Sequence, residues 1–201
     1  MTTPRDLLIA TLDAAPEPPV EQGELSLALA GAELLDLLDA EALSLDGDRI
    51  VPRLQPVLGD VLLDAAAGAL DRQAPYESVE DWLWRRGRGL YAAYFAALEK
   101  DGLVARRRHS ILPIRTGRTE LVDSPDRRRA AERWESDEPV LGALAAAIGI
   151  HDEPAEDFAD RVDEAVVTVL AAVNDAVVEL QATRQRRSIE EAAFDNVWRA
   201  P

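Results

Sequence analysis

The chain carries a helical pattern of apolar residues over positions 27–38, LALAGAELLDLL. Its apolar positions recur at intervals of three and four, which places them on one face of an α-helix: Leu27, Gly31, Leu34, Leu35 and Leu38. Glu33 and Asp36 fall between these positions and predict a polar side that faces solvent. This stretch therefore predicts an amphipathic helix that buries one face in a core.

Helical periodicity continues on both sides of this stretch. Ser78 and Asp81 have the spacing of a capping box at the start of a helix. Two runs interrupted by turn residues, 43–51 and 103–123, predict β-hairpins. The first apolar segment is 7–10. The other helical segments are 59–69, 79–84, 90–98, 127–134, 139–148 and 158–184, with a separate final helix that contains Ile189, Ala193 and Val197. Residues 1–201 are thus predicted to form a single, mostly helical domain with two short hairpins.

Composition excludes several classes of protein. The 201 residues include no cysteine, which rules out disulfides, thiolate zinc sites and cysteine catalysis. No apolar run reaches the roughly 18 residues expected of a membrane span. The start of the chain, MTTPRDLL, lacks the charged-then-apolar order of a signal peptide, so we expect a cytoplasmic protein.

Chemical motifs are also missing from the sequence. His109 and His151 have no partner at metal-ligand spacing, and no phosphate loop or nucleophile elbow is present. Acidic pairs such as Asp36 with Asp39 arise freely among 38 acidic residues. We therefore expect no enzymatic activity, no metal and no cofactor.

Charge is distributed unevenly along the chain. The net charge is −16, but residues 85–133 hold 13 basic and 6 acidic residues, a local balance of +7. A basic middle in an acidic body predicts one face that binds polyanions. The candidate residues are Arg85, Arg86, Arg88, Arg106, Arg107 and Arg108.

An apolar run, Ile111-Leu112-Pro113-Ile114, lies between the basic residues of the second hairpin. It is either a buried strand or an exposed tip that contacts a membrane or a partner protein. Trp82 shares a helical stripe with Leu83 and is predicted to lie in the core. Trp84 points elsewhere and is a candidate for an interface.

Four sequence strings, taken in order, resemble the bacterial branch of the Golgi phosphoprotein 3 family of peripheral membrane proteins. The string Gly59–Asp64 (GDVLLD) is nearly identical to the most recognisable one of that family. The other strings are 6–12 with 29–37, 78–82 leading to 98–104, and the arginine hairpin that ends at 121–123 and is followed by 127–134. Together they cover nearly the whole chain.

The resemblance implies a central four-helix bundle ringed by further helices, and a hairpin that touches membrane or neighbouring copies. Eukaryotic members bind phosphatidylinositol 4-phosphate and act as adaptors that retain glycosyltransferases in the Golgi. Of the family's lipid-pocket residues, a Trp and an Arg fall on Glu21 and Ala30, where both are missing. Two further arginines fall on Arg88 and Tyr91, so only Arg88 is kept.

We therefore expect a peripheral membrane adaptor on the inner membrane face that binds anionic or phosphoinositide-like head groups through the six arginines. Ile111, Leu112 and Ile114 would contact the membrane or a second copy, giving a homo-oligomer through the 103–123 hairpin. Protein clients are expected, and nucleic acid is not.

Two alternatives stay open. One is a winged-helix nucleic-acid binder, because a helix at 90–100 precedes an arginine-rich hairpin. The apolar segment 91–97 argues against it, since it offers few side chains to read base edges. The other is a helical interaction scaffold without lipid affinity.

Overall fold

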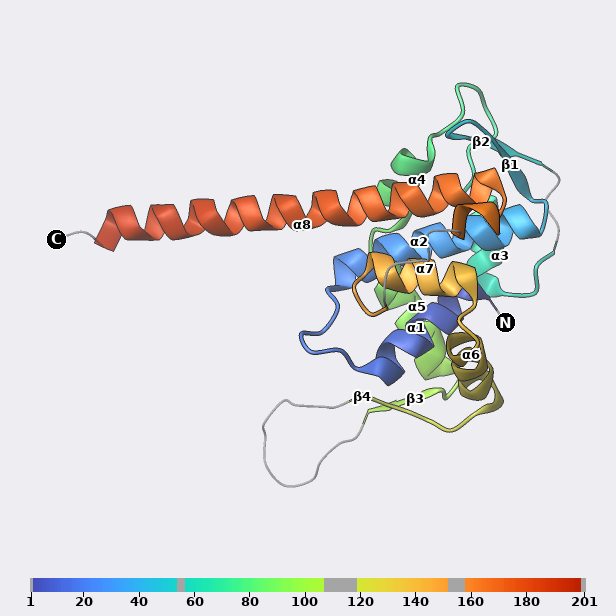
Figure 1. Ribbon diagram of the computed structural model, residues 1–201, viewed down its shortest axis with the longest axis horizontal. Coiled ribbons are helices and arrows are strands. Elements are labelled where there is room, and N and C mark those ends of the chain that lie inside the picture. Colours follow the sequence, from blue (N-terminus) through green and yellow to red (C-terminus); the bar gives the residue numbers. More distant parts are fainter. Residues whose placement is uncertain (1, 54–56, 107–118, 152–157, 200–201) are drawn as a thin grey trace.

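The structure, a computed structural model, describes residues 2–53, 57–106, 119–151 and 158–199 (Figure 1). The mostly helical fold with two short hairpins is confirmed. The elements in chain order are α1 (Thr3–Ala14), α2 (Gln22–Asp39), β1 (Leu43–Asp46), β2 (Arg49–Pro52), α3 (Val61–Gly68), α4 (Val79–Arg86), α5 (Leu90–Lys100), β3 (Val104–Arg106), β4 (Thr119–Leu121), α6 (Pro125–Glu135), α7 (Pro139–Ala147), a 3₁₀ turn (Phe158–Asp160) and α8 (Glu164–Arg199).

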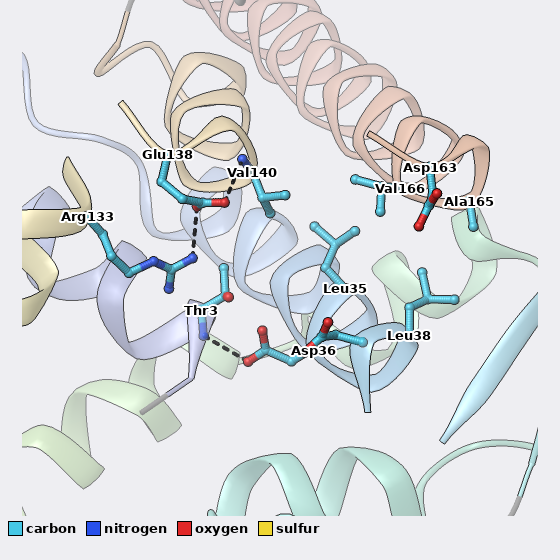
Figure 2. Close-up of a pocket in the computed structure, with 11 residues that line it drawn as sticks. Thr3, Leu35, Asp36, Leu38, Arg133, Glu138, Val140, Asp163, Ala165 and Val166 are labelled. Carbon is cyan, nitrogen blue, oxygen red and sulfur yellow. Dashed lines mark hydrogen bonds and ion pairs between the residues drawn. The ribbon is translucent and has the colours of Figure 1, made fainter. Parts of the chain in front are cut away.

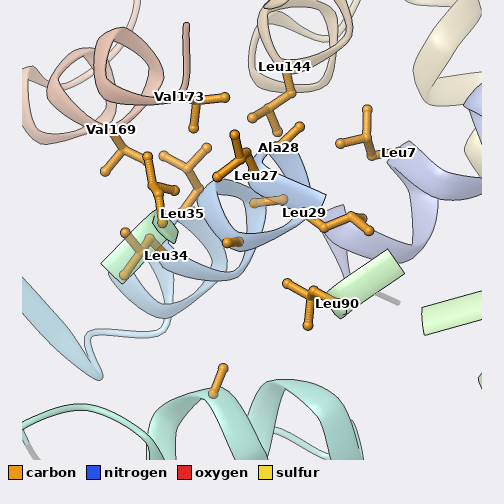
Figure 3. Packing of buried hydrophobic residues seen from close by; sticks show 14 of the residues in the cluster. Leu7, Leu27, Ala28, Leu29, Leu34, Leu35, Leu90, Leu144, Val169 and Val173 are labelled. Atoms are coloured by element: carbon orange, nitrogen blue, oxygen red, sulfur yellow. The ribbon is translucent and has the colours of Figure 1, made fainter. Parts of the chain in front are cut away.

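Helix α2 lies at the centre and is contacted by α1, α4, α5, α7 and α8. Its leucines point toward several of these neighbours at once, as Figure 3 shows for Leu29 and Leu34. The expectation that Glu33 and Asp36 face solvent is wrong: Glu33 has no exposed surface and Asp36 is half-buried. A helix that is surrounded on most sides has no broad solvent face, so its carboxylates are taken into the interior.

Gly31 sets the closest approach between α2 and α8. A Cβ atom at this position would overlap the side chain of Val173 on α8. Val169 and Val173 are fully buried, so this contact is part of the core. The absence of a side chain at Gly31 therefore lets α2 and α8 approach each other closely at this level.

Helix ends are capped by short polar side chains and glycine, and the capping box at Ser78 is confirmed. The Ser78 hydroxyl accepts a hydrogen bond from the Asp81 backbone N–H at 3.0 Å and donates to the Asp81 carboxylate at 2.7 Å. Asp60 caps α3 by accepting from the backbone N–H groups of Leu62 and Leu63. Gly102 takes a positive φ after α5, as a residue that ends a helix does.

Both hairpins are antiparallel pairs. In the first, Leu43 pairs with Pro52 and Asp46 with Arg49 around the turn at Gly47. In the second, β3 pairs with β4 from Val104 opposite Leu121 to Arg106 opposite Thr119. The predicted site residues Arg107, Arg108, Ile111, Leu112 and Ile114 lie outside the described residues.

Helix α8 replaces two predicted helices, because the chain stays helical from Glu164 to Arg199. Its segment Glu164–Glu191 is long and apolar enough to cross a membrane by length and composition. Val169, Val173 and Val177 are nevertheless buried, and α8 contacts α2, α4 and α7. One face of the first half of α8 therefore packs in the core, while most residues of this segment are exposed or half-buried.

We predict that Gly31→Ala destabilises the protein by about 1–3 kcal/mol, because the added methyl group overpacks the contact with Val173. The matched control is Gly142→Ala on α7, where the nearest atom to an added Cβ is 3.8 Å away. That change should stabilise the protein by about 0.5–1 kcal/mol through helix propensity. Urea unfolding followed by circular dichroism measures both, and equal stability of the two variants would contradict the prediction.

Candidate functional site

The arginines at the α4–α5 junction lie in three different environments. Arg85 donates to both carboxylate oxygens of Glu77, at 2.6 and 2.7 Å, and its guanidinium lies 5.1 Å from the centre of the Trp82 ring. The hydrogen bond to Glu77 raises the pKa of Arg85. Although Arg85 is half-exposed, it is already engaged within the protein.

Arg86 points inward and binds the buried carboxylate of Glu33. Its guanidinium donates to the two Glu33 oxygens at 2.7 and 2.8 Å, and the Tyr94 hydroxyl donates to the same carboxylate at 3.0 Å. Burial raises the pKa of Glu33, and the bonds from Arg86 oppose that effect. Arg86 therefore neutralises an interior charge, which removes it from the predicted head-group set.

Arg88 is the exposed member of the three, and it makes no hydrogen bond or ion pair with any residue that the structure describes. It lies between Gly87 and Gly89. A Cβ at Gly87 would come within 2.7 Å of the Leu83 carbonyl oxygen and 3.3 Å of that of Ser26. Gly89 has a positive φ of 73° and starts α5. Gly87 thus allows the junction to lie directly against α2, and Gly89 allows the chain to turn after Arg88.

A pocket of about 290 Å³ opens beside Arg88, between the first turn of α2, the start of α5 and α8. We call it the Arg88 pocket. Its wall includes Gln22, Ser26, Trp84, Arg88, Tyr91 and Leu180. The Ser26 hydroxyl accepts from the Tyr91 backbone N–H at 3.1 Å, which fixes the start of α5 against α2. The pocket therefore combines aromatic and polar groups with one cation that has no partner among the described residues.

Arg184 reaches the rim of this pocket from α8. It forms ion pairs with Glu24 at 3.2 Å and Glu21 at 3.7 Å, and its guanidinium lies over Gly23. No spacing in the sequence indicates this neighbour, because 160 residues separate Arg184 from Glu24. Arg184 adds no free charge, since the two carboxylates already compensate it.

The remaining candidates are less informative. The Arg106 backbone ends β3, opposite Thr119. Ala30, the position of a family arginine, is fully buried in α2 and its carbonyl accepts from the Trp82 indole N–H at 3.2 Å. Trp82 is a core residue, as predicted, and Trp84 lies at the Arg88 pocket.

No group of His, Cys, Asp or Glu within the described ranges is arranged to hold a metal ion.

A second pocket, of about 400 Å³, lies where α1, α2, α6, the start of α7 and the start of α8 meet (Figure 2). Arg133 bridges Asp6 at 2.6 Å and Glu138 at 2.8 Å, and the Thr3 backbone N–H donates to Asp36 at 2.8 Å. Burial raises the pKa of Asp36 to about 6. These charges join four segments of the fold, so their evident role is structural.

We predict that Asp36→Asn changes how stability depends on pH. Folding raises the pKa of Asp36 from 3.8 to about 6, so the folded state favours the protonated carboxyl group. The contribution of this group to the free energy of unfolding is therefore fully present below pH 4 and is lost as pH rises through 6. The asparagine carries no charge and keeps an oxygen that can accept from Thr3. Between pH 4 and 7, the free energy of unfolding of the variant should therefore rise by up to about 3 kcal/mol relative to that of the parent. Urea unfolding at four pH values measures this, and a constant difference would contradict it.

Comparison with known proteins assigns the fold to a family. A search of curated proteins gives no match. A family model described as Golgi phosphoprotein 3 (GPP34) matches residues 4–190, which is nearly the whole chain. The match extends from α1 into α8 and includes every residue that lines the Arg88 pocket. The chain belongs to the Golgi phosphoprotein 3 (GPP34) family.

Proposed function

We propose that this protein is a peripheral membrane adaptor that binds anionic phospholipid head groups in the Arg88 pocket. The observation that carries the proposal is the exposed guanidinium of Arg88, which has no partner among the described residues and lines a pocket. A guanidinium binds phosphate well because its planar fork donates paired, charge-assisted hydrogen bonds. The resemblance to the family supports the proposal, because a lipid-pocket arginine of the family corresponds to Arg88.

The composition of the pocket favours a head group with a single phosphate. Tyr91 stands where the family resemblance expects a second arginine, and Arg184 is compensated by Glu21 and Glu24. Among the residues that the structure describes, this leaves Arg88 as the uncompensated cation of the pocket, which suits one phosphodiester group. Trp84 and Tyr91 are half-buried aromatic residues beside it, and such side chains suit the boundary between head groups and acyl chains.

The acidic body does not prevent this binding. Charges on an exposed surface are screened over roughly 8 Å at physiological ionic strength, so groups near the membrane outweigh distant ones. We propose that the basic positions 106–108 add attraction at the membrane face, and that Ile111, Leu112 and Ile114 contact the membrane or a second copy. Client proteins and a location on the inner membrane face complete the proposal, which involves no catalysis.

The winged-helix alternative is less favoured by the surface of α5. Tyr94 and Leu98 are buried, and the residues that α5 exposes include Ala92, Ala93 and Ala96. Alanine side chains cannot form the hydrogen bonds that distinguish base pairs.

We predict that Arg88→Glu weakens binding to phosphatidylglycerol vesicles about thirtyfold. The change alters the local charge by two units, at about 1 kcal/mol for each unit near an anionic surface. A single substitution is preferable to reversing Arg85 and Arg86 as well, because loss of Arg86 would leave Glu33 buried without its cation. Vesicle co-sedimentation at two salt concentrations measures the effect, and binding of the parent should weaken with salt.

The matched control is Arg161→Glu, which makes the same charge change at an exposed residue just before α8. From Glu164, α8 carries the chain about 24 Å before it reaches Leu180 at the pocket. Equal loss from both variants would show that net charge rather than the pocket governs binding. The parent is also tested with duplex DNA. Binding to DNA but not to vesicles would support the winged-helix alternative, and binding to neither DNA nor vesicles would support the interaction scaffold.

A further inference from the structure

The guanidinium of Arg184 uses only part of its hydrogen-bonding capacity on its partners in the protein. Its Nη1 group pairs with Glu24 at 3.2 Å and with Glu21 at 3.7 Å, so one nitrogen holds both carboxylates. Its Nη2 group forms no hydrogen bond or ion pair with a residue that the structure describes. Because a guanidinium is a planar fork whose nitrogens donate in different directions, Nη2 can donate to a further acceptor.

The Nη2 group lies at the wall of the Arg88 pocket. Helix α8 passes the first turn of α2 (Figure 1), and a Cβ atom on Gly23 would come within 2.7 Å of Nη2. The same Cβ would come within 3.0 Å of the Leu180 side chain. Gly23 and Leu180 both line the pocket, so Nη2 is at its edge. The absence of a side chain at Gly23 lets the guanidinium lie directly against α2.

Arg88 and Arg184 differ in what they offer an anion. Arg88 brings a positive charge that no described residue compensates, whereas the charge of Arg184 is compensated by Glu21 and Glu24. A phosphodiester has two unesterified oxygens that share one negative charge. Arg88 can neutralise that charge, and Nη2 can donate to the second oxygen without adding positive charge. The two arginines together therefore suit one phosphodiester group.

We propose that Arg184 is a ligand-binding residue of the Arg88 pocket, and that the pocket selects a phosphodiester over a phosphomonoester. The inference rests on the head-group binding proposed above and names the phosphate chemistry of that head group. Arg88 donates to one unesterified oxygen of the diester, and Nη2 of Arg184 donates to the other.

Glu21 and Glu24 supply the discrimination. A phosphomonoester carries a second negative charge near neutral pH, since its second pKa is about 6. Two carboxylates share the single cation Arg184, and the described residues that line the pocket include no cation besides Arg88. The Glu24 side chain is only 10% exposed, so salt screens its charge poorly. A second charge on the ligand therefore meets like charge at the pocket edge.

The test compares two kinds of vesicle. Phosphatidylglycerol presents a phosphodiester and phosphatidic acid a phosphomonoester, and each is mixed with digalactosyldiacylglycerol, a neutral lipid without phosphate, to the same zeta potential. The whole chain should bind the phosphatidylglycerol vesicles about tenfold more tightly, because the second charge of phosphatidic acid is repelled at the pocket. Equal binding, or tighter binding to phosphatidic acid, would overturn the proposed selectivity.

Two variants remove the Nη2 contact and keep the positive charge. Arg184→Lys retains a cation for Glu24 but has no second nitrogen, and Gly23→Ala places a Cβ where Nη2 lies. Each should weaken binding to phosphatidylglycerol about tenfold, the effect of losing one charge-assisted hydrogen bond. Arg186→Lys on α8 and Gly142→Ala on α7 are the matched controls and should bind like the parent. Circular dichroism confirms that each variant is folded.

The carboxylates are tested by the double variant Glu21→Gln, Glu24→Gln. Each glutamine keeps an oxygen that can accept from Arg184, while two negative charges are removed. The preference for phosphatidylglycerol should fall to within about twofold, because binding to phosphatidic acid improves. Asp175→Asn with Glu179→Gln removes two exposed charges of α8 that do not line the pocket, and should keep the preference. A purely structural role of Glu21 and Glu24 would leave the ratio unchanged and would contradict the proposal.

Other outcomes separate this inference from the proposed function. A parent that does not bind phosphatidylglycerol vesicles would overturn head-group binding itself. Binding that is lost in Arg88→Glu but unchanged in Arg184→Lys and Gly23→Ala would leave head-group binding standing and overturn the role of Arg184.

A soluble ligand distinguishes a lipid from a free phosphodiester. The parent should bind glycerophosphoglycerol, the water-soluble head group, more weakly than it binds vesicles, because Trp84 and Tyr91 then have no membrane boundary to contact. Equally tight binding of the soluble compound would show that a free phosphodiester, rather than a lipid, is the ligand.

Discussion

A carboxylate with no exposure to solvent lies at the centre of α2, and the fold around it is arranged to neutralise it. Burying an unpaired charge costs several kcal/mol, so Glu33 requires partners that are themselves held in place. Arg86 comes from the last turn of α4 and Tyr94 from the middle of α5. Both helices must therefore face α2 at the same level, which leaves little freedom for the three residues that join them.

This constraint determines where the candidate binding residue lies. The junction Gly87–Gly89 is pressed against the first half of α2 because its neighbours on both sides are held by Glu33. Arg88 is left at the surface, beside Ser26 and Tyr91. The position of the Arg88 pocket thus depends on an ion pair that takes no part in binding. A run of arginines in the sequence overstates the charge available to a ligand, since Arg85 and Arg86 have partners inside the protein.

Local features were predictable from the sequence, and features that depend on distant neighbours were not. The cap at Ser78, the turn at Gly47 and the stop at Gly102 follow from short-range chemistry. The burial of Glu33 could not be read from periodicity, because a helical pattern shows which face is apolar but not how many helices surround it.

The candidate site shows the same division. The basic region and the position of Arg88 could be predicted, whereas the partners of Arg85 and Arg86 could not, because Glu33 lies 53 residues from Arg86 in the chain. Arg184 reaches the pocket from an even more distant segment. The polar residues that follow it also suggested a break between two helices, although α8 is continuous there.

The Arg88 pocket is assembled from three parts of the chain that are made at different times. Its wall needs Gln22 and Ser26 from the first fifth of the sequence, Trp84 to Tyr91 from the middle, and Leu180 from near the end. A nascent chain that has not yet released α8 from the ribosome cannot form it, and neither can a proteolytic fragment that has lost α8. Any activity that resides in this pocket therefore requires all three segments, and it cannot appear before α8 has been made and packed.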